Sequence, residues 1–104
     1  MSGAKIKRDA KRFRILDAAI EMALEDGYLM ITKRGIARRA DVNESLVAYY
    51  WGDVESLKGK VLETAVERGI LKIVAQGLCA GDDIAVKAPL EQRKLAAEMI
   101  IDGL

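Results

Sequence analysis

The sequence contains no histidine and only one cysteine, Cys79. A single thiol cannot close a disulfide within the chain, and without histidine it cannot complete a zinc site. No Gly-rich phosphate loop and no paired nucleophile and base stand out, so no catalytic constellation is available. We therefore expect a protein that is not an enzyme, that uses no metal and no cofactor, and that occupies the reducing cytoplasm.

Proline and long apolar runs are also scarce. Pro89 is the only proline, and no apolar run reaches the roughly 18 residues that a membrane span requires. The basic N-terminus is not followed by an apolar stretch, so no signal peptide is expected. No segment alternates as a strand would, which predicts an all-α fold with no membrane among its partners.

Charge is distributed unevenly along the chain. Residues 1–60 carry twelve Lys and Arg against nine Asp and Glu, whereas residues 61–104 carry five against seven. The first fourteen residues alone hold six cations and one acid. This asymmetry indicates an anionic partner at the N-terminal side, although a solvated helix face explains the charge pattern equally well.

Apolar residues recur at helical spacing near the N-terminus. Phe13, Leu16 and Ile20 lie three or four residues apart, as residues on one face of a helix do. Glycine is a common residue just beyond the end of a helix, and Gly27 stands at such a position. The pattern predicts a first helix over about residues 7–26.

Two short helices are expected next. Thr32 is a suitable N-cap for a helix over residues 33–40, and Asn43 for one over residues 44–51. Only a few residues separate the two helices, which is the arrangement of a helix-turn-helix. The sequence thus predicts a three-helix helix-turn-helix DNA-binding domain over residues 1–52.

The C-terminal part is predicted to contain two further helices. An apolar stripe indicates a long fourth helix that runs to about residue 76, with Gly69 as a place for a bend. The stretch GLCAGDD is expected to be a loop. Pro89 suits the start of a fifth helix over residues 90–101.

Three of the five aromatic side chains stand in a row, at Tyr49, Tyr50 and Trp51. Successive residues of a helix point about 100° apart, so three adjacent rings cannot all face one core. Trp51 shares a face with Val47 and is expected in the core. The outer face then carries small and polar side chains that suit a DNA major groove. This face comprises Asn43, Glu44, Ser45, Ala48 and Tyr49, with Leu46 and Tyr50 at its margins.

The order of these segments resembles the tetracycline-repressor (TetR) family of bacterial transcription regulators. The resemblance rests on RFRILDAAIEMALEDG, ITKRGIARRADV and NESLVAYYWGDVESL, and it covers about the first 60 residues. It implies that Thr32 touches a phosphate and that the start of the third helix contacts bases. The chain departs from the family pattern at four positions. Asp41 stands where the family usually has glycine in the turn, and Val54 stands where it has a phosphate-binding lysine after the third helix. Gly35 is unfavourable inside the second helix, and Glu44 would place a negative charge against a polyanion.

The resemblance and the outward face together predict a set of DNA contacts. Lys58 is included as a replacement for the cation that is missing at Val54. The N-terminal cations are included because the resemblance implies contacts to the DNA backbone or minor groove there. The competing interpretation for Tyr50 is packing under the third helix. For the N-terminal cations it is an ordinary contribution to solubility. The predicted DNA-binding residues are Thr32, Lys33, Arg34, Asn43, Glu44, Ser45, Leu46, Ala48, Tyr49, Tyr50, Lys58, Arg8, Lys11 and Arg12.

Residues 53–104 are interpreted as a helical dimerisation segment. About 44 residues remain after Lys60, too few to enclose the usual ligand pocket, so a small-molecule inducer is not expected. The apolar stripe is wider than one short helix needs, which indicates a homodimer. The predicted interface comprises Val66, Ile70, Ile73, Val74, Leu95, Met99 and Ile100.

These inferences lead to two functional hypotheses. The first is a sequence-specific regulator that binds double-stranded DNA as a homodimer and represses by occupying an operator. The second is a protein-interaction module, such as an anti-repressor or a heterodimer partner, that keeps the helix-turn-helix without strong DNA binding. Val54, Glu44 and the formal net charge of only +1 motivate the second hypothesis.

Overall fold

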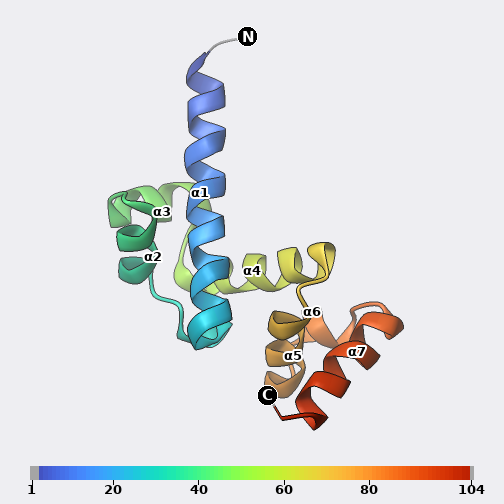
Figure 1. Ribbon diagram of the computed structural model, residues 1–104. Coiled ribbons are helices and arrows are strands. Elements are labelled where there is room, and N and C mark those ends of the chain that lie inside the picture. Colours follow the sequence, from blue (N-terminus) through green and yellow to red (C-terminus); the bar gives the residue numbers. More distant parts are fainter. Residues whose placement is uncertain (1–2, 104) are drawn as a thin grey trace.

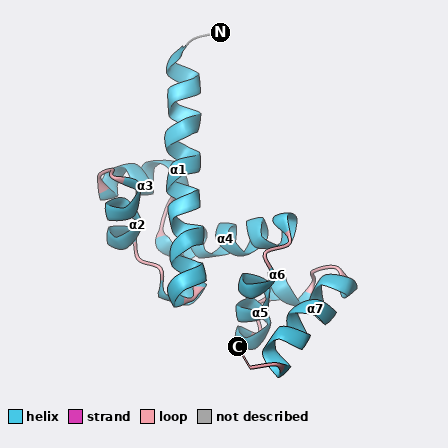
Figure 2. Cartoon of the chain, in the orientation of Figure 1, coloured by secondary structure: helices cyan, strands magenta, loops and turns pink. Residues whose placement is uncertain are grey.

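The computed structural model describes residues 3–103, with side chains from Asp9 onward, and within this range the chain is helical without a strand (Figure 2). This confirms the predicted all-α class. None of the described helices is long and apolar enough to cross a membrane. The elements are α1 (Gly3–Asp26), the 3-10 helix η1 (Tyr28–Met30), α2 (Lys33–Ala40), α3 (Glu44–Trp51), α4 (Val54–Arg68), α5 (Leu71–Ala80), α6 (Asp83–Val86) and α7 (Leu90–Ile101).

The N-terminal part is a three-helix unit in which α2 and α3 pack against α1. The first helix begins earlier than the predicted residue 7, and its N-terminal half extends beyond the two short helices (Figure 1). Ile15, Ile36 and Val47, one from each helix, are fully buried where the three meet. The predicted bounds of α2 and α3 are confirmed at both ends.

Local capping explains where α2 begins and ends. The backbone N–H of Gly35 donates to Thr32 Oγ1 over 3.0 Å, which caps α2. Asp41 ends α2 in the left-handed conformation, at φ 58° and ψ 52°, which an aspartate adopts more readily than most residues. Asn43 occupies the N-cap position of α3, but its side chain makes no capping hydrogen bond.

The long fourth helix that the sequence predicts is instead two helices. Gly69 adopts a left-handed conformation after Arg68, and the N–H of Ile70 donates to the carbonyl oxygen of Ala65 over 2.8 Å. This is the hydrogen bonding that commonly closes a helix at a glycine, so Gly69 terminates α4 instead of bending it. From α7, Gln92 Nε2 donates to the Val66 carbonyl oxygen over 2.9 Å and supports the same end.

The segment predicted as a loop is also helical over much of its length. Residues 77–80 complete α5, and residues 83–86 form α6. Gly77 makes this possible because α5, α4 and α6 meet there: a Cβ at Gly77 would lie 2.8 Å from Ala85 Cβ and 2.9 Å from Leu62 Cδ1. The predicted fifth helix over residues 90–101 is confirmed as α7.

Candidate nucleic-acid interface

The outward face of α3 is polar and ends in a tyrosine ring. Asn43, Glu44 and Ser45 are exposed, and Tyr49 is 74% exposed, which makes it the outward ring of the aromatic triplet. Its ring centroid lies 5.1 Å from that of Tyr50, in an edge-to-face arrangement. The Tyr50 ring thus packs against the Tyr49 ring. The remaining predicted contacts on this helix, Ala48, Tyr50 and Leu46, are half-buried.

Trp51 fixes the C-terminal end of α3 to α1. Its Nε1 donates to the Arg12 carbonyl oxygen over 3.1 Å, and the Arg12 guanidinium lies 4.6 Å from the ring centroid. A cation over an indole face at this distance is attracted by the ring quadrupole. Trp51 is therefore half-buried against α1, not enclosed in the core as predicted, and Arg12 is held beside it. Lys11 is exposed on α1, whereas the side chain of Arg8 lies outside the described residues.

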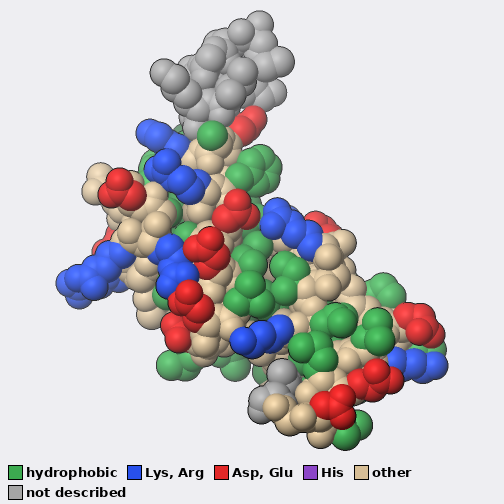
Figure 3. Space-filling view, viewed as in Figure 1, with side chains coloured by type: hydrophobic (Ala, Val, Ile, Leu, Met, Phe, Trp, Pro, Cys, Tyr) green, Lys and Arg blue, Asp and Glu red, His purple; other side chains and the backbone are tan. Residues whose placement is uncertain are grey.

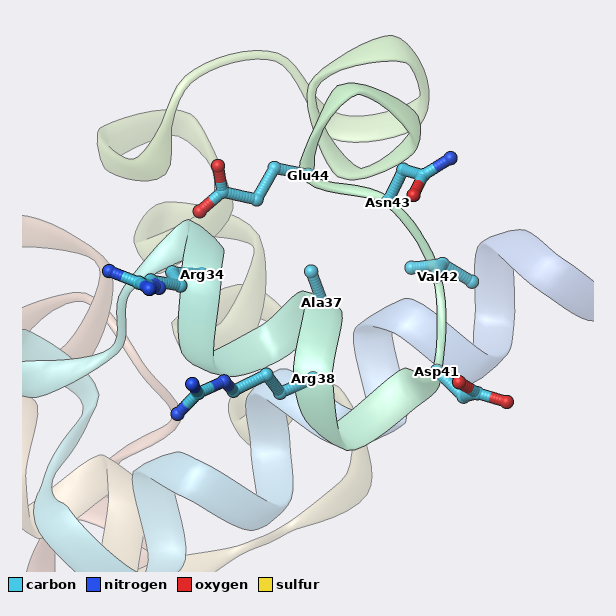
Figure 4. Close-up of a pocket in the computed structure, with 7 residues that line it drawn as sticks. All are labelled: Arg34, Ala37, Arg38, Asp41, Val42, Asn43 and Glu44. Atoms are coloured by element: carbon cyan, nitrogen blue, oxygen red, sulfur yellow. The ribbon is translucent and has the colours of Figure 1, made fainter.

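An open groove of about 680 Å³ runs between α2 and the N-terminus of α3. Figure 4 shows Arg34 and Arg38, one helical turn apart on α2, projecting to the same side of this groove. Glu44 turns toward that side, and Asn43 turns to the other. The groove thus presents two guanidinium groups, a carboxylate and an amide, a set of groups able to contact phosphates and base edges.

Arg39 has a different role from its neighbour Arg38. Its guanidinium makes a bidentate pair with Glu25 of α1, with Nη1 to Oε1 at 3.0 Å and Nη2 to Oε2 at 2.6 Å, and Glu21 Oε1 lies 3.6 Å away. The hydrogen bonds from Arg39 hold the pKa of Glu25 below its ordinary value. This network ties the last turn of α2 to α1 and so helps to fix the orientation of the helix-turn-helix.

A second groove, of about 510 Å³, lies where the N-termini of α2 and α4 come together, and it is lined by Lys33 and Lys58, both predicted DNA contacts. Lys33 is half-buried, and Lys58 Nζ lies 3.1 Å from Glu55 Oε1 with only 17% of its side chain exposed. Thr32 belongs to the same groove and already accepts the capping hydrogen bond. The cation proposed to replace a lysine at Val54 is therefore paired within α4.

An exposed apolar pair in η1 was not predicted from the sequence. Leu29 and Met30 are 53% and 66% exposed, whereas the flanking Tyr28 and Ile31 are buried. The apolar run from Tyr28 to Ile31 gave no means of separating the buried positions from the exposed ones, because a 3-10 turn follows neither the strand nor the α-helical period.

The structure divides the predicted dimer residues into two groups. Ile73 and Val74 are fully buried within the chain's own core. Their side chains are therefore not available to a second copy, and this removes them from the predicted interface. The other five remain at least partly exposed: Val66, Ile70, Leu95, Met99 and Ile100. Hydrophobic side chains reach the surface over the C-terminal helices, between charged ones (Figure 3).

Comparison with known proteins adds one finding to this geometry. Residues 15–57 match the family model described as "Bacterial regulatory proteins, tetR family". The match spans the C-terminal half of α1, both short helices and the start of α4. No curated protein and no solved structure matches the chain. Among the residues that the structure describes, no group of acidic or cysteine side chains is placed to hold a metal ion.

Proposed function

Residues 15–57 of this chain form a helix-turn-helix domain of the tetR family of bacterial regulatory proteins, and on this premise we propose that the chain is a sequence-specific repressor. It occupies a DNA operator in the bacterial cytoplasm and carries out no catalysis. Residues 1–52 supply the DNA-binding part, and residues 53–104 supply a dimerisation segment.

The observation that carries this proposal is the outward face of α3. Asn43 is exposed and makes no capping hydrogen bond, and Glu44 forms no ion pair within the described part of the chain. Base edges in a major groove offer donors and acceptors to such side chains, and phosphates accept hydrogen bonds from a tyrosine hydroxyl. The exposed Arg34 and Arg38 extend the same surface along α2.

The proposed dimerisation segment, residues 53–104, would join two copies of the chain into a homodimer. Two helix-turn-helix units bound to one face of DNA are about 34 Å apart, so a dimer reads two half-sites. The C-terminal helices retain partly exposed apolar side chains for this contact, among them Leu95, which is 48% exposed.

The repressor proposal is tested by fluorescence anisotropy on duplexes selected from a random pool. We expect a preferred sequence whose affinity falls steeply with salt, since Lys and Arg release counterions from the phosphates. Tyr49→Ala should weaken binding to all sequences alike, whereas Asn43→Ala and Ser45→Ala should change the preferred sequence. Lys72→Ala, on α5 at the far end of the molecule from α3 (Figure 1), is the control and should change neither property. A wild-type protein without sequence preference at any salt concentration would reject the proposal.

An interaction module without strong DNA binding is the second candidate function. The exposed Leu29 and Met30 favour it, together with the engagement of Lys58 by Glu55. A protein that ignores all duplexes and copurifies with another regulator would support this candidate. Under this candidate, replacing Leu29 and Met30 with serine should abolish the copurification. Under the repressor proposal, the same replacement should leave DNA binding unchanged.

A further inference from the structure

Glu44 is placed so that its charge is uncompensated inside the chain. It is the first residue of α3, it is exposed, and its carboxylate turns toward the side of the groove where Arg34 and Arg38 project (Figure 4). Neither arginine forms an ion pair with it in the part of the chain that the structure describes. The N-terminus of a helix stabilises a carboxylate, which favours this position for an acidic side chain.

A carboxylate in a DNA major groove discriminates strongly between bases. It is an acceptor only, so it needs a donor opposite. Guanine presents two acceptors there and thymine one, and both would leave the carboxylate unsatisfied. The adenine N6 donor lies between two acceptors, its own N7 and thymine O4, whereas the cytosine N4 donor has an acceptor, guanine O6, on one side only. Cytosine is therefore the base that best accommodates Glu44.

The negative charge of Glu44 also weakens binding to every DNA sequence that offers it no hydrogen-bond donor. A carboxylate near phosphates is repelled, and only a hydrogen bond from a base recovers part of that loss. Specificity often arises in this way, through a group that penalises the wrong partner. Arg34 and Arg38 line the same groove as Glu44, so two cations lie beside the carboxylate and are available to DNA phosphates.

We propose that Glu44 determines specificity by selecting a C·G base pair, its carboxylate accepting a hydrogen bond from the cytosine N4 amine. This inference rests on the proposed binding of α3 to DNA. It names the base pair that the surface reads, which neither the family match nor the fold assigns.

The experiment compares duplexes selected by the wild type with those selected by Glu44→Ala and Glu44→Gln. Wild-type sites should share a C·G pair at one fixed position, with about tenfold weaker binding when that pair is replaced. Glu44→Ala should lose this preference and bind the replaced sites more tightly than the wild type does. Glu44→Gln should shift the preference toward A·T, because a carboxamide pairs with adenine N6 and N7.

A modified base tests the contact directly. In paired N4-methylcytosine the methyl group projects into the major groove and removes the free N4–H. It should weaken wild-type binding about tenfold, as loss of the base contact does, and leave Glu44→Ala unaffected. Glu91→Ala is the matched control, since Glu91 is an exposed glutamate in the first turn of α7, and it should behave as the wild type. Circular dichroism establishes that each variant keeps its helices.

The outcomes separate the two proposals. A wild type that binds no duplex selectively contradicts the repressor proposal and this inference with it. A selective wild type whose sites lack a shared C·G pair overturns the assignment of Glu44 alone. The same conclusion follows if Glu44→Ala keeps the preference or remains sensitive to N4-methylation.

Discussion

At the scale of single residues, Tyr28 is a buried aromatic that joins the turn after α1 to the C-terminal helices. Its backbone N–H donates to Gln76 Oε1 over 2.9 Å, and its hydroxyl donates to Asp82 Oδ2 over 3.3 Å. Burial raises the pKa of Tyr28 to about 12, and the charge of Asp82 contributes in the same direction. Both effects favour the neutral phenol over the phenolate.

This perturbed tyrosine predicts a loss of stability in alkaline solution. Between pH 10 and pH 12 the unfolded chain loses the Tyr28 proton while the folded chain keeps it, so the free energy of unfolding falls as the pH rises. The decrease attributable to Tyr28 should be roughly 1 kcal/mol between about pH 9 and 11. Urea denaturation of the wild type and of Tyr28→Phe measures it, and the variant should show the smaller decrease. Parallel pH profiles would contradict the assignment.

At the scale of helices, two glycines in helix interiors have opposite environments. Gly59 of α4 faces open space, since a Cβ there would meet only Ile84 Cδ1, at 4.0 Å. Gly77 of α5 faces the crowded junction of α5 with α4 and α6, where a Cβ would come within 2.8 Å of Ala85 Cβ. The first glycine therefore costs helix stability without a packing reason, and the second is required by packing.

Alanine at these two positions should change stability in opposite directions. Gly59→Ala should raise the free energy of unfolding by about 0.5–1 kcal/mol, because alanine restricts the unfolded chain and favours a helix. Gly77→Ala should lower it by about 1–3 kcal/mol, since Ala85 and Leu62 have to move apart. Thermal melts of the two variants beside the wild type provide the measurement, and shifts of the same sign would refute the packing argument.

At the scale of the whole molecule, Gln76 connects the helix-turn-helix to the C-terminal helices. From α5 its Oε1 accepts from the Tyr28 N–H, and its Nε2 donates to the Ala23 carbonyl oxygen over 3.0 Å. Both partners belong to the end of the first helix and the turn after it. One side chain thus satisfies two backbone groups at the place where α1 and η1 meet α5.

Removal of this side chain should loosen the junction. Gln76→Ala leaves the Tyr28 N–H without its acceptor, whereas the Ala23 carbonyl oxygen keeps its hydrogen bond from the Gly27 N–H. The variant should lose about 1–3 kcal/mol of stability. Hydrogen exchange should show a faster-exchanging Tyr28 amide, whereas the Ser56 amide, which donates to Asp53 Oδ1 over 2.8 Å, should keep its protection in the native state. Unchanged exchange at Tyr28 would show that the junction does not depend on Gln76.

Part of the candidate site could be predicted from the sequence, and part depends on contacts across the whole molecule. The outward position of Tyr49 and the inward position of Val47 follow from the helical period alone, and the structure places both side chains as expected. The difference between Arg38 and Arg39 does not follow from it. The two are adjacent cations, and only the approach of Glu25, fourteen residues away in the chain, engages Arg39.

The bounds of α2, α3 and α7 and the outward face of α3 could be predicted from the sequence, because capping residues and helical periodicity act within three or four residues. Contacts between distant helices were needed to show that Ile73 and Val74 lie inside the chain's own core and that Gln92 of α7 holds the C-terminal end of α4. An apolar stripe shows which side of a helix avoids water. What covers that stripe depends on how the helices fold back on one another.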